Sequence, residues 1–459
     1  MQKTLIYTVT ILAATIMVAC SGTRQLPKPQ LDMPETFAGV MQADSLSYAD
    51  LSWWEFYTDE NLRNLIERTL EANRDLLKAA ARMDELRELY GVERLNLAPK
   101  LNGIAGFTNE TNNYDGHGVD KDLEISLKAS VSWEINLWGA QKWARSKSRG
   151  EYLASAEDYR AMQMSLIAQT ATAYFNLIAL DNEIAIVRQT LVTRKESLEQ
   201  ARLRYEGGLT SEIVYQQAMV EYTTTASLIP ALEQKRTVSV NALSLLTGDF
   251  PGKEIHRSHL FLDAEMPDSI MPGMPSRLLQ RRPDLRAAEL RLSAAMANVG
   301  LKYADRFPNF IVGFTGGFEN DALAGFLKSP FTYSLGNISG SIFDFGRKKR
   351  NYKASISAYE QARLDYEKSV MTAFTEVDNA IAGYRNARDG AALKASLRDA
   401  ALKYVQLARL QYRGGTLNYI DVLDAQRRYF DAQIGYSNAR RDEYLALVQL
   451  YKAIGGGTR

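Results

Sequence analysis

Hydrophobic and polar residues alternate without a break along residues 123–137. The odd positions, from Leu123 to Leu137, are apolar, and the even positions, from Glu124 to Asn136, are polar or charged. A period of two over this length predicts a β-strand with one apolar and one polar face. At about 3.3 Å per residue the strand would span roughly 50 Å, longer than strands in soluble domains usually run. Lipid on one side and water on the other is the simplest environment that requires such a strand.

The chain also contains an internal repeat. Ala-Arg-Leu-Arg-Tyr-Glu-Gly-Gly at 201–208 returns as Ala-Arg-Leu-Gln-Tyr-Arg-Gly-Gly at 408–415, an offset of 408 − 201 = 207. Each copy is predicted to run helix, β-hairpin, very long helix, Gly-Gly break and helix. Strands are expected near 100–110, 123–137, 309–319 and 331–343. The apolar phase of the last strand slips near Gly336, which predicts a β-bulge there.

The long segments that follow Gly139 and Gly346 keep a seven-residue apolar repeat. In the first copy the two apolar columns are Tyr159, Leu166, Ala173, Leu180 and Val187, and Leu177, Ile184, Leu191, Leu198 and Tyr205. This pattern is typical of helices that pack side by side over long distances. Some 65 residues of helix would be about 100 Å long. A long soluble helical bundle would explain the helices and leave the alternating strands unexplained.

These elements divide the chain into consecutive segments. In order they are 1–19, a lipoprotein signal peptide; 20–60, a lipidated tether and equatorial segment; 61–99, a helix of repeat 1 (near Asn61 to Leu97); 100–138, transmembrane β-hairpin 1; 139–247, a long helix, tip turn and return helix; 248–275, an equatorial linker; 276–307, a helix of repeat 2; 308–345, transmembrane β-hairpin 2; 346–450, the second long helix, tip turn and return helix; and 451–459, a C-terminal tail.

The N-terminus has the layout of a bacterial lipoprotein signal. Lys3 precedes an apolar run from Leu5 to Ala19, and Cys20 follows at the position where such signals are cleaved and acylated. Cys20 is the only cysteine, so no internal disulfide can form. The alternative is a plain secretory signal that happens to end at a cysteine. Acyl chains on Cys20 would help to hold the protein at a membrane, and Ser21 fits outer-membrane sorting.

Composition excludes several functions and decides little else. The chain has 459 residues, 46% of them hydrophobic, and a net charge of +1, so it carries no basic footprint for nucleic acid. The histidines His117, His256 and His259 form no HExxH motif, and no phosphate-binding glycine loop or GxSxG element occurs. We therefore expect no enzyme, no metal site and no cofactor apart from the covalent lipid on Cys20.

The strand count predicts an oligomer. Two hairpins give four strands, and an open sheet edge cannot sit in lipid, because each unpaired backbone group costs several kcal/mol. The smallest membrane barrels have about 8 strands. Two chains would give eight strands with a filled interior, and three would give twelve with room for a lumen.

Four stretches of the chain resemble the TolC-like outer-membrane efflux channels, of the OprM/NodT-type lipoprotein branch. They are 132–139 (Ser-Trp-Glu-Ile-Asn-Leu-Trp-Gly), 275–289 (Pro-Ser-Arg-Leu-Leu-Gln-Arg-Arg-Pro-Asp-Leu-Arg-Ala-Ala-Glu), Phe307-Pro308 with the glycine-rich strand after it, and 412–425 from Tyr-Arg-Gly-Gly to Asp-Val-Leu-Asp-Ala. The resemblance covers nearly the whole mature chain.

The resemblance implies an α+β membrane protein. Three protomers would share a 12-stranded transmembrane β-barrel, with four strands from each, that continues into a long periplasmic α-helical barrel with a mixed equatorial domain. The homotrimer would be the outer-membrane exit duct of a tripartite efflux system. It would be a passive channel, gated at the periplasmic tip, that takes small molecules, either drugs or metal ions, from an inner-membrane pump of the RND type and a periplasmic adaptor. The same kind of tube can also export proteins or polysaccharide.

Asp421 and Asp424 are the candidate periplasmic gate. They are three residues apart, so they share a helix face, and in a trimer that face would bring six carboxylates to one ring. Such a ring selects cations and raises the pKa values of its own members. The resemblance places both, with Tyr412, at the periplasmic constriction, whereas Leu417 stands where some members carry a locking arginine. The alternative is an acidic pair that the helix dipole stabilises.

Two further sets of residues are candidate functional positions. Glycine pairs mark the predicted tip turns, which the family uses for adaptor contact: Gly207, Gly208, Gly414 and Gly415. Polar strand residues are expected to face the barrel lumen and keep it wet: Glu124, Lys128, Glu134 and Glu319.

Overall fold

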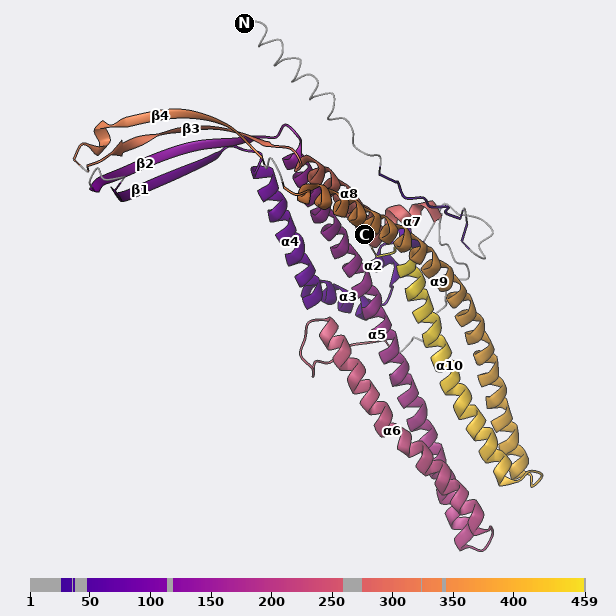
Figure 1. Ribbon diagram of the computed structural model, residues 1–459. Coiled ribbons are helices and arrows are strands. Elements are labelled where there is room, and N and C mark those ends of the chain that lie inside the picture. Colours follow the sequence, from indigo (N-terminus) through magenta and orange to yellow (C-terminus); the bar gives the residue numbers. More distant parts are fainter. Residues whose placement is uncertain are drawn as a thin grey trace. The chain divides into compact units, whose positions relative to one another are not determined.

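The computed structural model describes residues 26–34, 36–37, 48–113, 119–258, 275–322, 324–340 and 344–457. The chain divides into two compact units. The first comprises Met1–Leu31, Met83–Ser155 and Ala287–Lys368, and the second comprises Asp32–Arg82, Ala156–Arg286 and Ser369–Arg459. The first unit contains the sheet, and the second consists mainly of helices (Figure 1).

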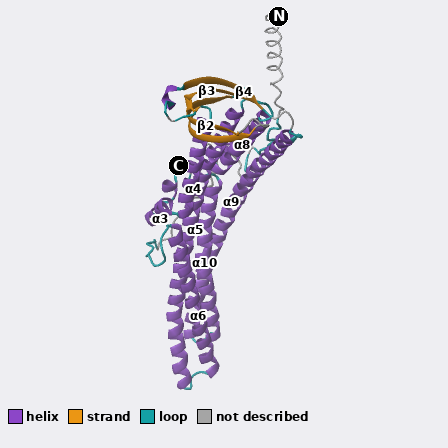
Figure 2. Cartoon of the chain, turned by 60° about the vertical axis from the view of Figure 1, so that its left-hand side comes forward, coloured by secondary structure: helices purple, strands orange, loops and turns teal. Residues whose placement is uncertain are grey.

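The sheet of the first unit has four antiparallel strands in the order β1-β2-β3-β4. They are β1 (Lys100–Asn113), β2 (Val119–Ile135), β3 (Asn309–Asn320) and β4 (Pro330–Ser339). Both predicted hairpins are present, and β2 also pairs with β3, so the two repeats join in one sheet (Figure 2). The short 3-10 helix η4 (Phe326–Lys328) lies in the connection between β3 and β4.

The predicted bulge near Gly336 is wrong. The pairing of β3 with β4 runs in continuous register from Asn309↔Ser339 to Phe318↔Pro330, with Gly336 opposite Val312. The apolar positions of β4 therefore change face without any change in register. Phe331, the neighbour of Gly317 in this register, has its ring centroid 5.8 Å from the ammonium nitrogen of Lys128, which places it on the polar face of the sheet.

The long helices repeat to the residue. α5 (Ala140–Glu206) and α9 (Arg347–Arg413) each have 67 residues, and α6 (Glu212–Leu246) and α10 (Tyr419–Ala453) each have 35. The starts differ by 347 − 140 = 207 and 419 − 212 = 207. Within the heptad columns predicted from the sequence, Leu177 and Val187 of α5 are fully buried, whereas Tyr205, at the end of the helix, is 39% exposed. None of the helices in the described ranges is long and apolar enough to cross a membrane.

The predicted continuous helix near Asn61–Leu97 is interrupted. It consists of α3 (Glu60–Ala72) and α4 (Arg74–Leu95), which meet at Asn73. The Asn73 side chain accepts hydrogen bonds from the amides of Asp75 (3.0 Å) and Leu76 (3.1 Å) and donates one to the carbonyl of Leu246 (3.0 Å). The Asn73 side chain thus caps the first amides of α4 and is itself fixed by the C-terminal end of α6. Both contacts favour a break at this residue over a continuous helix.

The second repeat has its own helices at this position. The short α7 (Pro275–Arg281) leads into α8 (Pro283–Ala304), and Pro283 occupies the first residue of α8 as the sequence predicts. Near the N-terminus of the chain, the 3-10 helix η2 (Tyr48–Asp50) precedes α2 (Trp53–Phe56).

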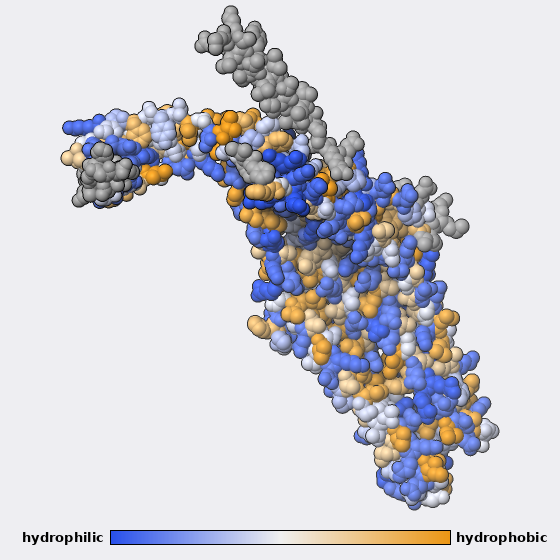
Figure 3. Space-filling view, viewed as in Figure 1, coloured by the Kyte–Doolittle hydropathy of each residue, from blue (hydrophilic) through white to orange (hydrophobic). Residues whose placement is uncertain are grey.

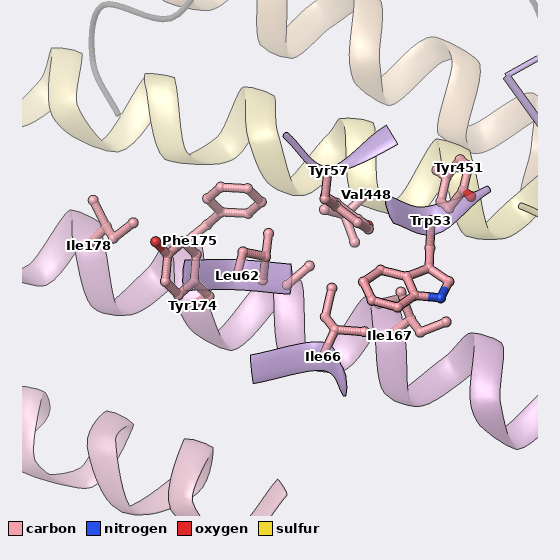
Figure 4. Close-up of a cluster of buried hydrophobic side chains, with 12 residues drawn as sticks. Trp53, Tyr57, Leu62, Ile66, Ile167, Tyr174, Phe175, Ile178, Val448 and Tyr451 are labelled. Carbon is pink, nitrogen blue, oxygen red and sulfur yellow. The ribbon is translucent and has the colours of Figure 1, made fainter. Parts of the chain in front are cut away.

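The main core of the second unit joins short N-terminal helices to long ones (Figure 4). Trp53 and Leu62, from α2 and α3, pack with Ile167 of α5 and Tyr451 of α10. Each such side chain contributes about 1.5–3 kcal/mol when it is fully buried. Tyr174 of α5 donates a hydrogen bond of 2.6 Å to the carboxylate of Asp59, the N-cap of α3.

Candidate functional site

The two tip turns have the same backbone geometry. Gly208 and Gly415 have φ of +72° and +76°, the left-handed region that favours glycine. The amide of Gly415 donates to the carbonyl of Tyr412 (3.1 Å), and the amide of Thr416 donates to that of Gln411 (3.0 Å). The same two bonds recur at Gly208 in the first repeat. These bonds form a Schellman cap that ends each long helix. In each glycine pair only the second glycine has the left-handed backbone conformation.

The candidate gate carboxylates lie directly after the second turn. Asn418 is the N-cap of α10, and Asp421 and Asp424 occupy the first two turns of that helix. Asp424 accepts a hydrogen bond of 2.8 Å from Arg428, one turn further along α10, and its side chain is 39% exposed. Asp421 and Asp424 are both partly exposed at the start of α10, where the positive end of the helix dipole favours negative charge.

Tyr412 connects the two repeats near the tip. Arg204 of α5 donates a hydrogen bond of 2.6 Å to the Tyr412 hydroxyl, and its guanidinium carbon lies 5.8 Å from the centre of the Tyr412 ring. Leu417, where a locking arginine was considered, instead packs against an apolar cluster that includes Val422 and Tyr412. No sequence pattern pointed to Arg204, whose counterpart in the second repeat is the neutral Gln411 (411 − 204 = 207).

A second connection lies further along the helices, and no sequence pattern pointed to it; only its Arg194 end is buried. Arg194 of α5, only 6% exposed, contacts Glu221 of α6 at 2.9 Å. The other oxygen of Glu221 contacts Arg427 of α10 at 3.1 Å. Arg194 also hydrogen bonds to Thr225, and its guanidinium carbon lies 5.3 Å from the centre of the Phe430 ring. Burial lowers the pKa of the Arg194 guanidinium, an effect that the negative charge of Glu221 opposes.

Three of the four residues predicted to face the lumen lie in one cluster, and the fourth, Glu134, lies apart from it. Lys128 of β2 contacts Glu124 at 3.0 Å and Glu319 of β3 at 2.9 Å. Glu319 lies opposite Ser126, which explains why its carboxylate reaches the same face. Glu134 shares that face further along β2, opposite Ile311, and is not part of the cluster.

Other candidate chemistry receives no support within the described residues. No group of three or more histidine, cysteine, aspartate or glutamate side chains there could hold a metal ion. His256 is exposed, whereas His117, His259 and Cys20 lie outside the described residues.

Long paired helices and a four-stranded sheet with an apolar face are typical of channel-forming outer-membrane proteins. The model of the outer membrane efflux protein family matches residues 65–249 and 274–456. The chain belongs to this family.

Two curated relatives match along nearly their full length. The toluene efflux pump outer membrane protein TtgF of Pseudomonas putida is 31% identical, with 97% of this chain and 96% of the relative covered. The cation efflux system protein CusC of Escherichia coli is 28% identical, with 97% of each covered.

Solved structures give the same result. The open state of the MtrE outer membrane channel of Neisseria gonorrhoeae is 28% identical, with a TM-score of 0.83 over 95% of this chain and 98% of that one. A membrane protein of Pseudomonas aeruginosa is 27% identical, with a TM-score of 0.86 over 95% and 98%. The predicted fold class of long helices with a sheet domain is confirmed.

The family also confirms the predicted function at the level of class. The chain is the outer-membrane component of a tripartite efflux system and works with a periplasmic adaptor and an inner-membrane pump. It is a passive channel of the outer membrane and not an enzyme.

Proposed function

We propose that three copies of the chain close one barrel and form a gated exit duct. The strand order carries this proposal: β1 and β4 are the edges of the sheet, and neither has a second neighbour among the described strands. In lipid such edges require pairing, and twelve strands leave room for a lumen. β1 of one protomer would pair with β4 of the next.

The gate of this duct is the ring of Asp421 and Asp424. The supporting observation is their place in the first two turns of α10, directly after the Schellman cap at Gly415. Three copies bring six carboxylates together, and such a ring attracts cations and repels anions. Tyr412, held by Arg204, fixes the adjacent end of α9.

The adaptor docks on the ends of the helix pairs around the turns at Gly207–Gly208 and Gly414–Gly415. A groove of about 490 Å³ between α6 and α10 supports this placement. Its walls include the exposed side chains of Ile213 (69%) and Ile420 (54%) beside polar residues. Figure 3 shows hydrophobic and hydrophilic residues interspersed along the helices.

The cargo consists of small molecules, drugs, solvents or metal ions, that an RND-type pump selects. Relatives of similar identity carry the words toluene and cation in their names, which supports a duct whose cargo is chosen by its pump.

An acyl anchor on Cys20 completes the proposal. Cys20 is the only cysteine and follows the apolar run of the signal. The probable outer membrane lipoprotein SilC of Salmonella typhimurium is 28% identical over 470 residues, which supports lipidation.

Single-channel recording tests the gate. Protein purified from the outer membrane would first be weighed by native mass spectrometry, with trimers of acylated chains expected, and then placed in planar bilayers beside the variant Asp421→Ala/Asp424→Ala. We expect small, cation-selective openings for the parent and larger, less selective openings for the variant. Trimers whose conductance and selectivity are unchanged by the substitutions would show that the constriction lies elsewhere, and another oligomeric state would contradict the closure.

A further inference from the structure

The ammonium group of Lys128 lies between two carboxylates on the polar face of the sheet. It is 3.0 Å from a carboxylate oxygen of Glu124 on the same strand, β2, and 2.9 Å from one of Glu319 on β3. Both carboxylates are open to solvent on this face, since their side chains are 41% and 44% exposed. Two carboxylates that converge on one point hold a hard cation in many proteins. Here that point is occupied by an ammonium of the chain itself.

Small residues make room for this arrangement. In the register of the sheet Lys128 is opposite Gly317 of β3, and Gly317 is opposite Phe331 of β4. Because Gly317 has no side chain, the lysine can extend across β3, and its nitrogen lies 5.8 Å from the centre of the Phe331 ring. Ser126, between Glu124 and Lys128 on the same face of β2, is buried, as expected for a residue that the ion pair covers. The charged groups therefore lie along the surface of the sheet.

The ion pairs are not required to form the sheet. Exposed pairs contribute about 0–1 kcal/mol, and β2 pairs with β3 without a break over Ile125–Ile135. The second hairpin has apolar residues at the equivalent positions. Phe331 stands at that of Glu124 (331 − 207 = 124). Leu335 stands at that of Lys128 (335 − 207 = 128), and β4 nevertheless pairs in regular register. The consequence of the cluster therefore lies in its charge.

The lysine changes the charge that the polar face carries. One ammonium and two carboxylates leave a net charge of −1 per chain at this point, whereas the carboxylates alone would leave −2. In a barrel of three chains, removal of the lysine would leave six carboxylates uncompensated at this level. At about 0.01 M salt the Debye length is roughly 30 Å, so such charges act far into the lumen, whereas at about 1 M it is roughly 3 Å and they act only at the wall.

We propose that Lys128 is a specificity-determining residue of the barrel. Its ammonium occupies the position between Glu124 and Glu319 that a cationic cargo would take, and it thereby keeps positively charged molecules and metal ions from binding to the wall as they pass. The carboxylates remain as polar groups that keep the wall wet, but they do not form a binding site. The proposal rests on the proposed barrel of three chains, in which this face of the sheet lines the lumen.

Manganese binding tests the proposal, because this divalent ion prefers carboxylate and water ligands. Every protein compared carries Asp421→Ala/Asp424→Ala, so that the proposed gate ring binds none of the metal. In this background Lys128→Met removes the ammonium and leaves both carboxylates in place. The unbound ion is measured by electron paramagnetic resonance on purified trimers. We expect one additional manganese ion per chain, with a dissociation constant of about 10⁻³ M, as for oxygen sites with few protein ligands.

Two controls separate the carboxylate pair from a general gain of negative charge. Lys100→Met removes a positive charge from the same face, because Lys100 is opposite Ser132 in the register of β1 with β2, and it leaves Lys128 in place. Lys128→Met/Glu319→Gln removes the ammonium together with one of the two carboxylates. We expect neither control to bind the additional ion.

Reversal potentials show whether the site affects passage. We expect Lys128→Met to raise the permeability ratio of potassium over chloride roughly 2-fold or more at about 0.01 M salt and to leave it unchanged at about 1 M. Lys128→Cys provides a rescue in assembled trimers. Modification with 2-aminoethyl methanethiosulfonate returns an ammonium to this position and should remove both effects, whereas methyl methanethiosulfonate returns none. The background protein, treated in the same way, controls for Cys20.

Additional manganese and higher cation selectivity in Lys128→Met but in neither control, both reversed by the ammonium-bearing reagent in Lys128→Cys, would support the proposal. Manganese binding no greater than that of the background would overturn it, and so would an equal gain in either control. Additional binding without a change in selectivity at low salt would also overturn it, because the site would then not affect passage. If Lys128→Met and Lys128→Cys form no trimers while Lys100→Met forms them, the lysine is structural and the proposal is wrong.

The proposed function fails by different results. Native mass spectrometry that finds another number of chains in the parent assembly contradicts the closure of the barrel. Conductance that is the same in the parent and in Asp421→Ala/Asp424→Ala removes the gate, and the comparison at Lys128 within that background still holds.

Discussion

Asp249 shows how one carboxylate can join separate segments of the second unit. It follows the C-terminus of α6 and contacts Arg68 of α3 at 2.6 Å and Lys253 at 2.5 Å, and Thr247 donates a hydrogen bond to it at 3.0 Å. The hydrogen bond from Lys253 holds the pKa of Asp249 below its usual value, and Thr247 and Arg68 add to this effect. The ionised carboxylate is thus stabilised in the folded protein.

The stability of the protein should therefore depend on Asp249 only when this residue is ionised. Because the pKa is lowered on folding, its contribution is fully present above the ordinary pKa of about 3.9 and is lost as the pH falls through the lower, folded value. We expect Asp249→Asn to cost about 1 kcal/mol at pH 7 and progressively less as the pH falls below about 4. Thermal unfolding from pH 7 to pH 3 measures this. Asp399→Asn, at an exposed pair with the adjacent Arg398, is the control, and a constant deficit at every pH would contradict the prediction.

At the residue scale the sequence predicts positions better than partners. Asp421, Asp424 and the tip glycines could be placed because they follow a repeated segment and a helix stop signal. Arg204 and Arg194 could not, because a lone arginine on a long helix has no spacing signal, and its partner is set by which helix packs beside it. At Leu417 the sequence shows that the arginine of some family members is absent. It does not show the apolar cluster against which Leu417 packs.

Close backbone approach within the sheet should make one glycine indispensable. A Cβ atom on Gly317 of β3 would lie 2.2 Å from the carbonyl oxygen of Leu127 in β2, whereas one on Gly336 of β4 would meet nothing within 4 Å. Gly317→Ala must therefore shift one strand against the other and cost about 1–3 kcal/mol or more. We expect much less assembled protein in the outer membrane for Gly317→Ala than for Gly336→Ala, as measured by heat-modifiable mobility in gels. Equal amounts of the two variants would contradict the pairing of β2 with β3.

Elements with a long uninterrupted period were predictable from the sequence. The period of two in β2 and the heptads of α5 each repeat often enough to outweigh local exceptions, which is why their ends fall within a few residues of the prediction. The break at Asn73 was missed because it depends on the carbonyl of Leu246, far along the chain. The bulge near Gly336 was wrong because a change of apolar face can occur in regular register when Lys128 covers an aromatic ring.

For the whole chain, the repeat shows where the two copies differ. The helices α5 and α9 begin 207 residues apart. In contrast, α4 and α8 begin 283 − 74 = 209 residues apart, and β1 and β3 begin 309 − 100 = 209 residues apart. The first copy is therefore two residues longer between its first strand and its long helix. Insertions in loops between strands are tolerated, whereas one residue more in the long helices would rotate every later core position.

Because α6 and α10 correspond residue by residue, carboxylates can be added to the proposed gate ring at the equivalent positions of α6. Val214 and Gln217 of α6 stand where Asp421 and Asp424 stand in α10, since 421 − 207 = 214 and 424 − 207 = 217. Both α6 and α10 begin one turn after equivalent caps, so aspartates at these positions would lie in the first two turns of α6. In a trimer the variant Val214→Asp/Gln217→Asp would double the carboxylates at this level from six to twelve.

We expect this variant to favour cations over anions more strongly than the parent, because the added charges repel anions and attract cations at the same constriction. Crowded carboxylates disfavour one another's ionisation, so the gain should weaken as the pH is lowered toward 4. Reversal potentials in asymmetric potassium chloride measure the selectivity, and Val214→Asn/Gln217→Asn controls for size and polarity. A selectivity that rises equally in both variants would show that charge is not the cause. A selectivity unchanged in the aspartate variant, while Asp421→Ala/Asp424→Ala alters it, would show that only the second repeat lines the constriction.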